Sequence, residues 1–151
     1  MKSIKLVTSL LLLSVFLFSA CNKQVKLEKR LDGTWNIDLF NYEERENGVV
    51  DPTNKFTLSN CGTIVLVRND KTNTGTITTT AFGSTSIQTI TEWTNTEEKL
   101  TIKSTDGTTT ETTVFDIILN EKDAQEWKST ETTTAGGVTV VGESTYKLSR
   151  K

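Results

Sequence analysis

Apolar side chains alternate with polar ones along most of this chain, and this period of two restricts the fold more than any other feature. In Thr34–Tyr42, Trp35, Ile37 and Leu39 fall on one side, and polar residues stand between them. Successive side chains of a β-strand point to opposite faces, so the pattern predicts strands with one buried and one wet face. After residue 31, no apolar pattern of period 3.6 lasts longer than two turns, which argues against the helical and α/β classes.

Threonine supports the same interpretation. It makes up about a fifth of the 151 residues, and its β-branched side chain suits a pleated, half-buried surface better than a helix. Threonine runs at 78–80, 108–110 and 132–134 do not form a true repeat. We interpret them as solvated strand ends and turns.

Eight segments carry the strand pattern. They are Thr34–Tyr42, Cys61–Arg68, Thr74–Phe82, Ser84–Thr94, Glu98–Ser104, Thr112–Asn120, Ala124–Thr133 and Val138–Ser149. Turn signals such as Asp106-Gly107 and Gly136-Gly137 separate most of them. The one long connection, Asn41–Lys55, lies between the first strand and the second.

Consecutive strands joined by short turns favour an up-and-down antiparallel meander. Closing the meander removes the exposed edges that invite aggregation, and eight strands enclose space for side chains or one small ligand. We therefore predict an all-β, eight-stranded antiparallel up-and-down barrel, with a β-sandwich as the alternative. Outward charges oppose a barrel that faces lipid. These charges are on Lys99, Lys103, Glu143 and Lys147.

The first twenty residues predict a signal peptide. Lys2 and Lys5 precede the apolar run Leu6–Phe18, which is too short to span a bilayer, since a spanning helix needs about 20 residues. The string Phe18-Ser19-Ala20-Cys21 resembles the lipobox of bacterial lipoproteins, although Phe18 stands where leucine is usual. The resemblance implies that Cys21 is acylated and becomes the new N-terminus. The alternative is a plain signal peptide cut after Ala20.

This interpretation divides the chain into a signal peptide at 1–20, a lipidated tether at 21–31 and a barrel domain at 32–151. The chain is acidic overall, so acyl chains rather than a basic patch would hold it to a membrane. Asn22 follows the cysteine. Because an aspartate there is the usual inner-membrane signal, we expect the protein to be anchored in the outer membrane of a bacterial envelope. The sequence leaves open whether it faces the periplasm or the cell surface.

Gly33-Thr34-Trp35 resembles the G-x-W signature that opens the first strand of lipocalins. The arrangement is also similar to lipocalin-like lipoproteins of Bacteroidetes, through the motif 31–35, Cys61, Leu100-Thr101-Ile102 and the last strand around 146–149. The resemblance implies a lipocalin-like barrel whose closed end is filled by Trp35, with Gly33 providing the tight turn before it. It also implies a cation over Trp35, either Arg150 or Lys147.

The same resemblance implies a cavity for a small apolar molecule. By parity, Trp93, Trp127 and Tyr146 face inward and are candidate ligand-binding residues. Small hydroxylated residues share their faces, namely Thr89, Thr91, Ser129 and Ser144. Large aromatic side chains beside a few polar groups are typical of a ligand pocket. Alternatively, these aromatic residues fill the core and leave no room.

Several functional classes lack their residues. The chain has no histidine, which removes histidine-based triads and histidine-ligated zinc, and its net charge of −2 disfavours nucleic acid. The carboxylates at 43, 44, 46, 97 and 98 fall in strand ends or loops, where solvated charge is the ordinary interpretation. With no phosphate-loop, calcium-loop or C-x-x-C motif, we predict no enzyme, no cofactor and no metal. If Cys21 is acylated, Cys61 has no partner within the chain and is interpreted as a small strand residue.

Two functions remain. The first is a lipid-anchored envelope protein whose barrel binds a small apolar molecule. The second is a non-enzymatic protein-binding or accessory module of an envelope complex, acting through its exposed β-surface or the Asn41–Lys55 connection.

Overall fold

A computed structural model describes residues 26–151. The strands in chain order are β1 (Gly33–Glu46), β2 (Val49–Val67), β3 (Thr74–Ala81), β4 (Ser84–Asn95), β5 (Lys99–Thr105), β6 (Thr110–Asn120), β7 (Ala124–Ala135) and β8 (Val138–Arg150). A short helix at 26–31 precedes β1. The predicted signal peptide and the lipidation site Cys21 lie outside the described residues. Within 26–151, no helix has the length and apolar character needed to cross a bilayer.

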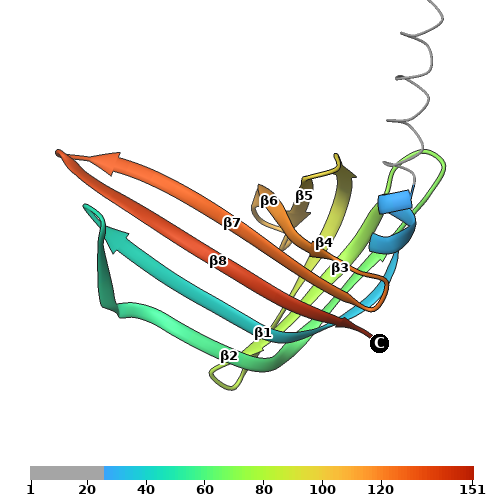
Figure 1. Ribbon diagram of the computed structural model, residues 1–151, viewed down its shortest axis with the longest axis horizontal. Helices are drawn as coiled ribbons and strands as arrows, with labels where there is room; N and C mark the ends of the chain where they lie inside the picture. The colour runs from blue at the N-terminus through green and yellow to red at the C-terminus, as the bar shows by residue number, and fades with distance from the viewer. Residues whose placement is uncertain (1–25) are drawn as a thin grey trace, which may run out of the picture.

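The eight strands form a closed barrel in sequence order (Figure 1). Each strand pairs antiparallel with the next, and β8 returns to pair with β1 from Trp35↔Arg150 to Glu46↔Val140. This arrangement confirms the predicted all-β up-and-down barrel, and the alternative β-sandwich is wrong.

The predicted connection Asn41–Lys55 is wrong, because these residues form an antiparallel hairpin. Asn41 pairs with Thr57 and Glu43 with Lys55. After a register shift between Glu43 and Arg45, the pairing resumes at Arg45↔Val50 and ends at Glu46↔Val49. The reversal occurs at Asn47 and Gly48, whose φ angles of 48° and 86° are those that a two-residue hairpin turn needs. Polar side chains occupy much of this hairpin, so its alternation is too weak to read as strands.

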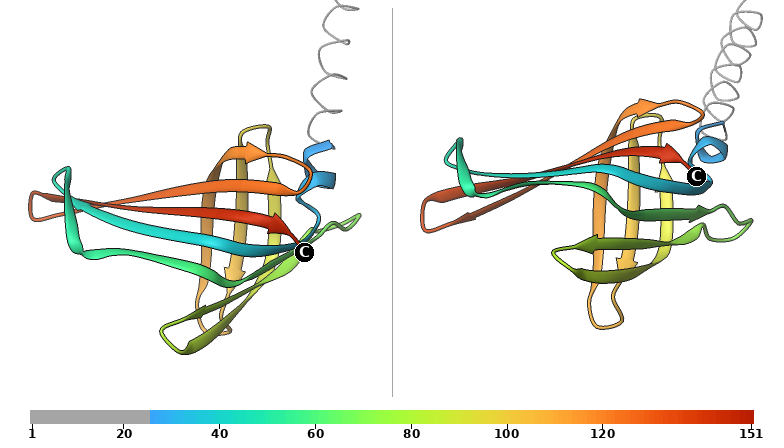
Figure 2. Two further views of the ribbon diagram at one scale, coloured as in Figure 1. Left: turned by 60° about the horizontal axis from the view of Figure 1, so that its bottom comes forward. Right: turned by 90° about the horizontal axis from the view of Figure 1, so that it is seen from below.

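The hairpins β1–β2 and β7–β8 extend well beyond the other four strands (Figures 1 and 2). We call this four-stranded extension, residues 41–60 and 129–145, the arm. In the arm β1 pairs with β2 and β8, and β8 pairs with β7. By contrast, β6 pairs with β7 only as far as Asp116↔Lys128, and β2 pairs with β3 only over Gly62–Val67. The barrel therefore closes at one end and opens toward the arm at the other.

The closed end holds the apolar core. Trp35 is fully buried, and its indole N–H donates to the carbonyl oxygen of Leu31 at 2.8 Å. Leu27 and Leu31 of the short helix are buried in the same core. Within the segment predicted as a tether, residues 26–31 therefore pack on the barrel, and residues 21–25 lie outside the described residues. Leu27 and Leu31 lie four apart, which places them on one face of a helix.

The cation that lies over Trp35 is Arg150 and not Lys147, the other residue that the resemblance allowed. Its guanidinium carbon lies 4.4 Å from the Trp35 ring centre, and its nitrogens donate to the carbonyl oxygens of Asp32, Arg30 and Lys122 at 2.7–3.0 Å. Lys147 lies outside, 3.7 Å from Glu126. One side chain thus ties the last strand to the chain segments on either side of the closed end.

Irregularities in the ladders change which residues face inward. A shift between Ile90 and Glu92 makes Thr91 an extra residue of β4. Ile90 and Trp93 are therefore both buried, whereas Thr89 and Thr91 are exposed. The predicted inward orientation of these two threonines is wrong, because a bulge reverses the parity of all residues beyond it.

The β5–β6 turn provides a pH-dependent prediction. The backbone N–H groups of Thr109 and Thr108, followed by the Thr108 hydroxyl, donate to Asp106 and lower its pKa from 3.8 to about 2. A lowered pKa means that the stabilisation is complete above pH 3.8 and is lost as pH falls toward about 2. We expect Asp106→Asn to weaken the acid dependence of unfolding in that window, measured by denaturant titration. Equal acid dependence in both proteins would contradict the assignment.

Candidate ligand site at the open end of the barrel

A cavity of about 240 Å³ lies where the barrel opens toward the arm. We call it the aromatic chamber. Its walls come from β1, β2, β3, β4 and β8 and from the turn after β3. They are formed by Phe40, Phe56, Leu58, Cys61, Ile77, Thr79, Ala81, Phe82, Gln88 and Tyr146. Apolar and aromatic walls with a few polar groups are the usual lining of a small-molecule site.

Four aromatic rings form a chain along the chamber. Phe40 on β1 lies 4.7 Å from Tyr146 and 5.9 Å from Phe56, measured between ring centres. Phe56 in turn lies 5.9 Å from Phe82. Phe82 is 83% exposed and has a φ of 52° in the β3–β4 turn. Its ring approaches β2 where β2 and β3 are no longer paired, so side chains close this part of the wall.

A second cavity of about 180 Å³ adjoins the chamber. We call it the polar compartment. It shares Ile77, Gln88 and Tyr146 with the chamber. The remaining walls are Ile102, Ser104, Glu111, Thr113, Phe115, Ser129, Glu131 and Ser144. The two cavities together offer an apolar space beside a hydrophilic one.

The candidate residues Trp93, Trp127 and Tyr146 occupy different places. Tyr146 lines both cavities, and burial, followed by the Cys61 charge, raises its pKa to about 12. Its hydroxyl therefore stays neutral at physiological pH. Trp93 and Trp127 lie in the core and line neither cavity. Their indole N–H groups donate to Thr74 and Gln125 at 3.0 and 3.3 Å.

Sequence reasoning missed Phe40, Phe56 and Phe82. An irregularity at Asp38, between the paired residues Ile37 and Leu39, turns Phe40 rather than Leu39 toward the core. Phe56 falls at the edge of the segment expected to be a connection, and Phe82 belongs to a turn. No local pattern in the sequence brings these three phenylalanines together, because they lie on different strands and in a turn.

Cys61 is part of the chamber wall. It lies within β2 beside an irregular stretch, since Asn60 has a φ of 50°, rather than at the start of a strand as predicted. Burial raises the pKa of its thiol, so the neutral form dominates at physiological pH and the sulfur is a poor nucleophile. A packing role for Cys61 fits this environment.

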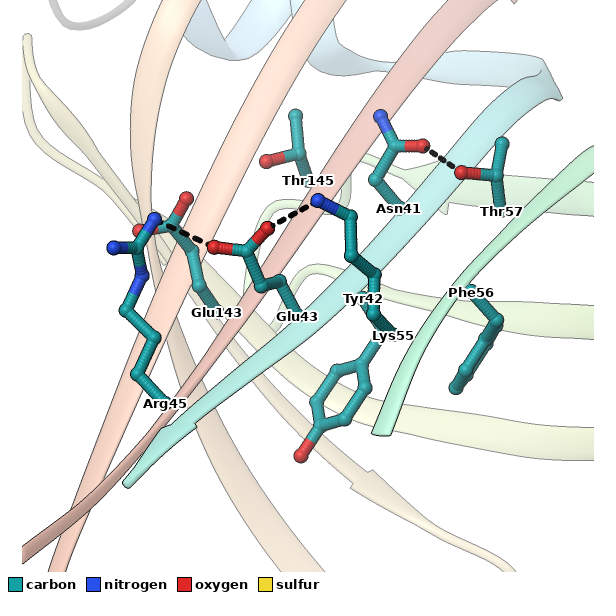
Figure 3. A pocket seen from close by; sticks show the side chains of 9 residues that line it. All are labelled: Asn41, Tyr42, Glu43, Arg45, Lys55, Phe56, Thr57, Glu143 and Thr145. Atoms are coloured by element: carbon teal, nitrogen blue, oxygen red, sulfur yellow. Dashed lines mark hydrogen bonds and ion pairs between the residues drawn. The ribbon is translucent and has the colours of Figure 1, made fainter. Parts of the chain in front are cut away.

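A hollow of about 410 Å³ lies on the outer face of the arm (Figure 3). There Glu43 accepts a hydrogen bond from Lys55 at 2.7 Å and contacts Arg45, and the Lys55 contact is the main cause of the lowered pKa of Glu43. Glu143 pairs with Lys128 at 2.7 Å. These charges already satisfy one another in a solvated setting, so we favour the aromatic chamber as the ligand site. Across residues 26–151, no three potential metal-ligating side chains gather at one place.

No protein-family model matches the sequence, and no curated protein matches it. A solved structure described as a redesigned β-barrel is similar, with 14% sequence identity and a TM-score of 0.45. The similarity covers 83% of this chain and 95% of that chain.

Proposed function

We propose that this protein is a lipid-anchored envelope protein whose barrel binds a small apolar molecule in the aromatic chamber. The observation that carries the proposal is the chamber itself, an apolar cavity walled by Phe40, Phe56, Phe82 and Tyr146 at the open end of a barrel. Burying an apolar ligand against these rings would remove apolar surface from water.

The size of the chamber restricts the ligand. Drug-sized ligands occupy pockets of roughly 300–1,000 Å³, and the chamber offers about 240 Å³. The buried side chains of Trp35, Trp93 and Trp127 occupy barrel interior outside the chamber. A ligand with one or two rings, or the end of a short apolar chain, fits this space.

The proposed anchor suits the orientation of the site. The described chain begins with the short helix at the closed end, where Leu27 and Leu31 join the core. Only residues 22–25 separate this helix from Cys21. Acylation of Cys21 would hold the closed end near the membrane and direct the chamber away from it, toward the aqueous phase.

Filling the chamber with a larger side chain should weaken ligand binding. Ala81 lines the chamber on β3, and its neighbour Thr80 is exposed on the other face of the strand. We expect Ala81→Trp to weaken binding of a neutral probe, 4-phenylbutanol, by at least about tenfold, because the indole occupies the ligand's space. Calorimetric titration of the full chain in phosphatidylcholine nanodiscs, with empty nanodiscs subtracted, measures this.

Thr80→Trp is the matched control and should bind like the parent. Equal affinity in the parent and Ala81→Trp would contradict the chamber as the site. Native mass spectrometry of protein purified from its host would test the anchor independently, because it reports the acyl mass on Cys21. A missing acyl mass would defeat the lipid-anchor part of the proposal.

The second candidate, a protein-binding accessory module, is favoured by a separate observation. Val49 at the tip of the arm is 72% exposed, and Ile87 on β4 is 63% exposed. Along the arm β2 has no β3 partner before Gly62, and an unpaired edge can accept a strand from another protein. A photo-crosslinker at Val49 that captures one defined envelope protein in the host would support this function, whereas no adduct would speak against it.

A further inference from the structure

The inner and outer faces of the strands differ in charge. Cationic side chains of the strands lie on the outer face, and most of them pair with carboxylates on that face. They include Arg45, Lys55, Lys99, Lys128 and Lys147. Neither the aromatic chamber nor the polar compartment is lined by any lysine or arginine, whereas Glu111 and Glu131 line the polar compartment.

These two carboxylates come from strands that do not pair with each other at this level. Glu111 lies opposite Ser104 on β5, and Glu131 lies opposite Gly142 on β8. Within residues 26–151, neither forms an ion pair with a cation. They therefore present uncompensated negative charge to the same small cavity, next to the serine hydroxyls of its wall.

The inner face of the arm extends this negative region. Glu44 and Glu131 lie on either side of Gly142 in one row across the sheet. The Tyr42 hydroxyl donates to Glu44 at 3.1 Å, over the space left by the missing side chain of Gly142. Burial first, then the hydrogen bond to Glu44, and then the charges of Glu44 and Glu131 raise the pKa of Tyr42. The floor that leads into the chamber thus combines aromatic rings, Tyr42 and Phe56 lying 5.4 Å apart, with carboxylates.

We propose that the ligand is a small cationic amphiphile, with its apolar part in the aromatic chamber and a protonated amine or quaternary ammonium at Glu111 and Glu131. This inference rests on the proposed binding function and specifies the class of ligand. Two adjacent cavities, one apolar and one hydroxylated and acidic, match the two ends of such a molecule. An anionic amphiphile such as a fatty acid would place its carboxylate beside two others with no cation near it.

A matched set of probes tests the charge preference directly. 4-Phenylbutylamine, 4-phenylbutanol and 4-phenylbutyrate share one ring and one chain and differ in the charge of the head. Calorimetric titration into the full chain in phosphatidylcholine nanodiscs, with empty nanodiscs subtracted, gives three dissociation constants. We expect the amine to bind roughly tenfold more tightly than the acid at low salt, and the preference to shrink as salt screens the exposed carboxylates.

Variants assign the preference to the two carboxylates. The double variant Glu111→Gln, Glu131→Gln leaves two uncharged side chains at the site. It should therefore lose the preference for the amine over the acid, while its affinity for the alcohol stays the same. Glu92→Gln is the matched control, because Glu92 is exposed on β4 and lines neither cavity. It should leave the ratio unchanged. Retained alcohol affinity also shows that the double variant is folded.

The outcomes separate this inference from the proposed function. If all three probes bind with equal affinity, or if the acid binds best, the cationic class is wrong while ligand binding stands. A preference that survives in the double variant also overturns the role of Glu111 and Glu131. If none of the three probes binds, the chamber is not a site for small apolar molecules, and both proposals fall together.

Discussion

Replacing Trp35 with alanine should lower the free energy of unfolding by about 3–5 kcal/mol, the cost of removing a large buried aromatic side chain. Trp35 is fully buried, and its indole N–H is bonded to Leu31 at 2.8 Å. The change would also leave Arg150 without the ring that it covers at 4.4 Å. Three parts of the closed end meet at this residue: the short helix, the first strand and the last strand. Urea unfolding followed by circular dichroism measures the loss.

Two control variants show how much of the stability loss comes from the buried indole of Trp35. Trp35→Phe keeps most of the buried area and removes the N–H donor, so we expect a loss smaller than that of Trp35→Ala. Thr34→Ala, on the same strand, changes a partly exposed residue and should alter stability by about 0.5 kcal/mol or less. An alanine variant that unfolds at the parent's urea concentration would show that Trp35 does not hold the closed end together.

Gly62→Ala should be the second severe substitution, with a loss of about 2–4 kcal/mol. A Cβ at this position would lie 1.9 Å from the carbonyl oxygen of Thr78 and 3.0 Å from the Cα of Thr79. Both are backbone atoms of the paired strand β3, so relief requires the β2–β3 ladder to open. The φ of Gly62, 153°, adds strain for any other residue. The same urea titration measures the change.

Gly48→Ala separates the steric clash from the backbone strain. Gly48 also has a positive φ, 86°, but no atom lies within 4 Å of its Cβ position. Its loss should therefore be only about 1 kcal/mol. A loss in Gly62→Ala no larger than in Gly48→Ala would contradict the close packing of β2 on β3. Because Gly62 follows Cys61, the clash should also disturb the chamber wall and weaken binding of 4-phenylbutanol.

Local patterns were sufficient to predict most of the strands. Alternation and turn residues located β3 to β8 to within a few residues, because most of these strands have alternating apolar residues and end at a turn with recognisable residues. The arm was missed because Asn41–Lys55 has polar residues on both faces, and its strands are specified by cross-strand pairs such as Glu43↔Lys55. Such pairs appear only when the register is known.

The binding site was predictable to a smaller extent. Parity correctly turned Tyr146 inward, since β8 runs without a register shift between Tyr146 and Leu148. It failed where an extra residue enters a strand, at Asp38 before Phe40 and at Thr91 in β4. Each bulge reverses the faces of the residues that follow it, and no residue type marks it reliably in a sequence.

The amino-acid sequence by itself determined that this chain builds eight antiparallel strands closed into a ring, because alternation and turn chemistry are local properties. Only the tertiary structure decided that two hairpins outgrow the others, that Phe40, Phe56 and Phe82 meet around a cavity, and that Glu111 and Glu131 face one space. These relations join residues far apart in the chain, and they depend on strand register, strand length and bulges, which are settled when the strands pair.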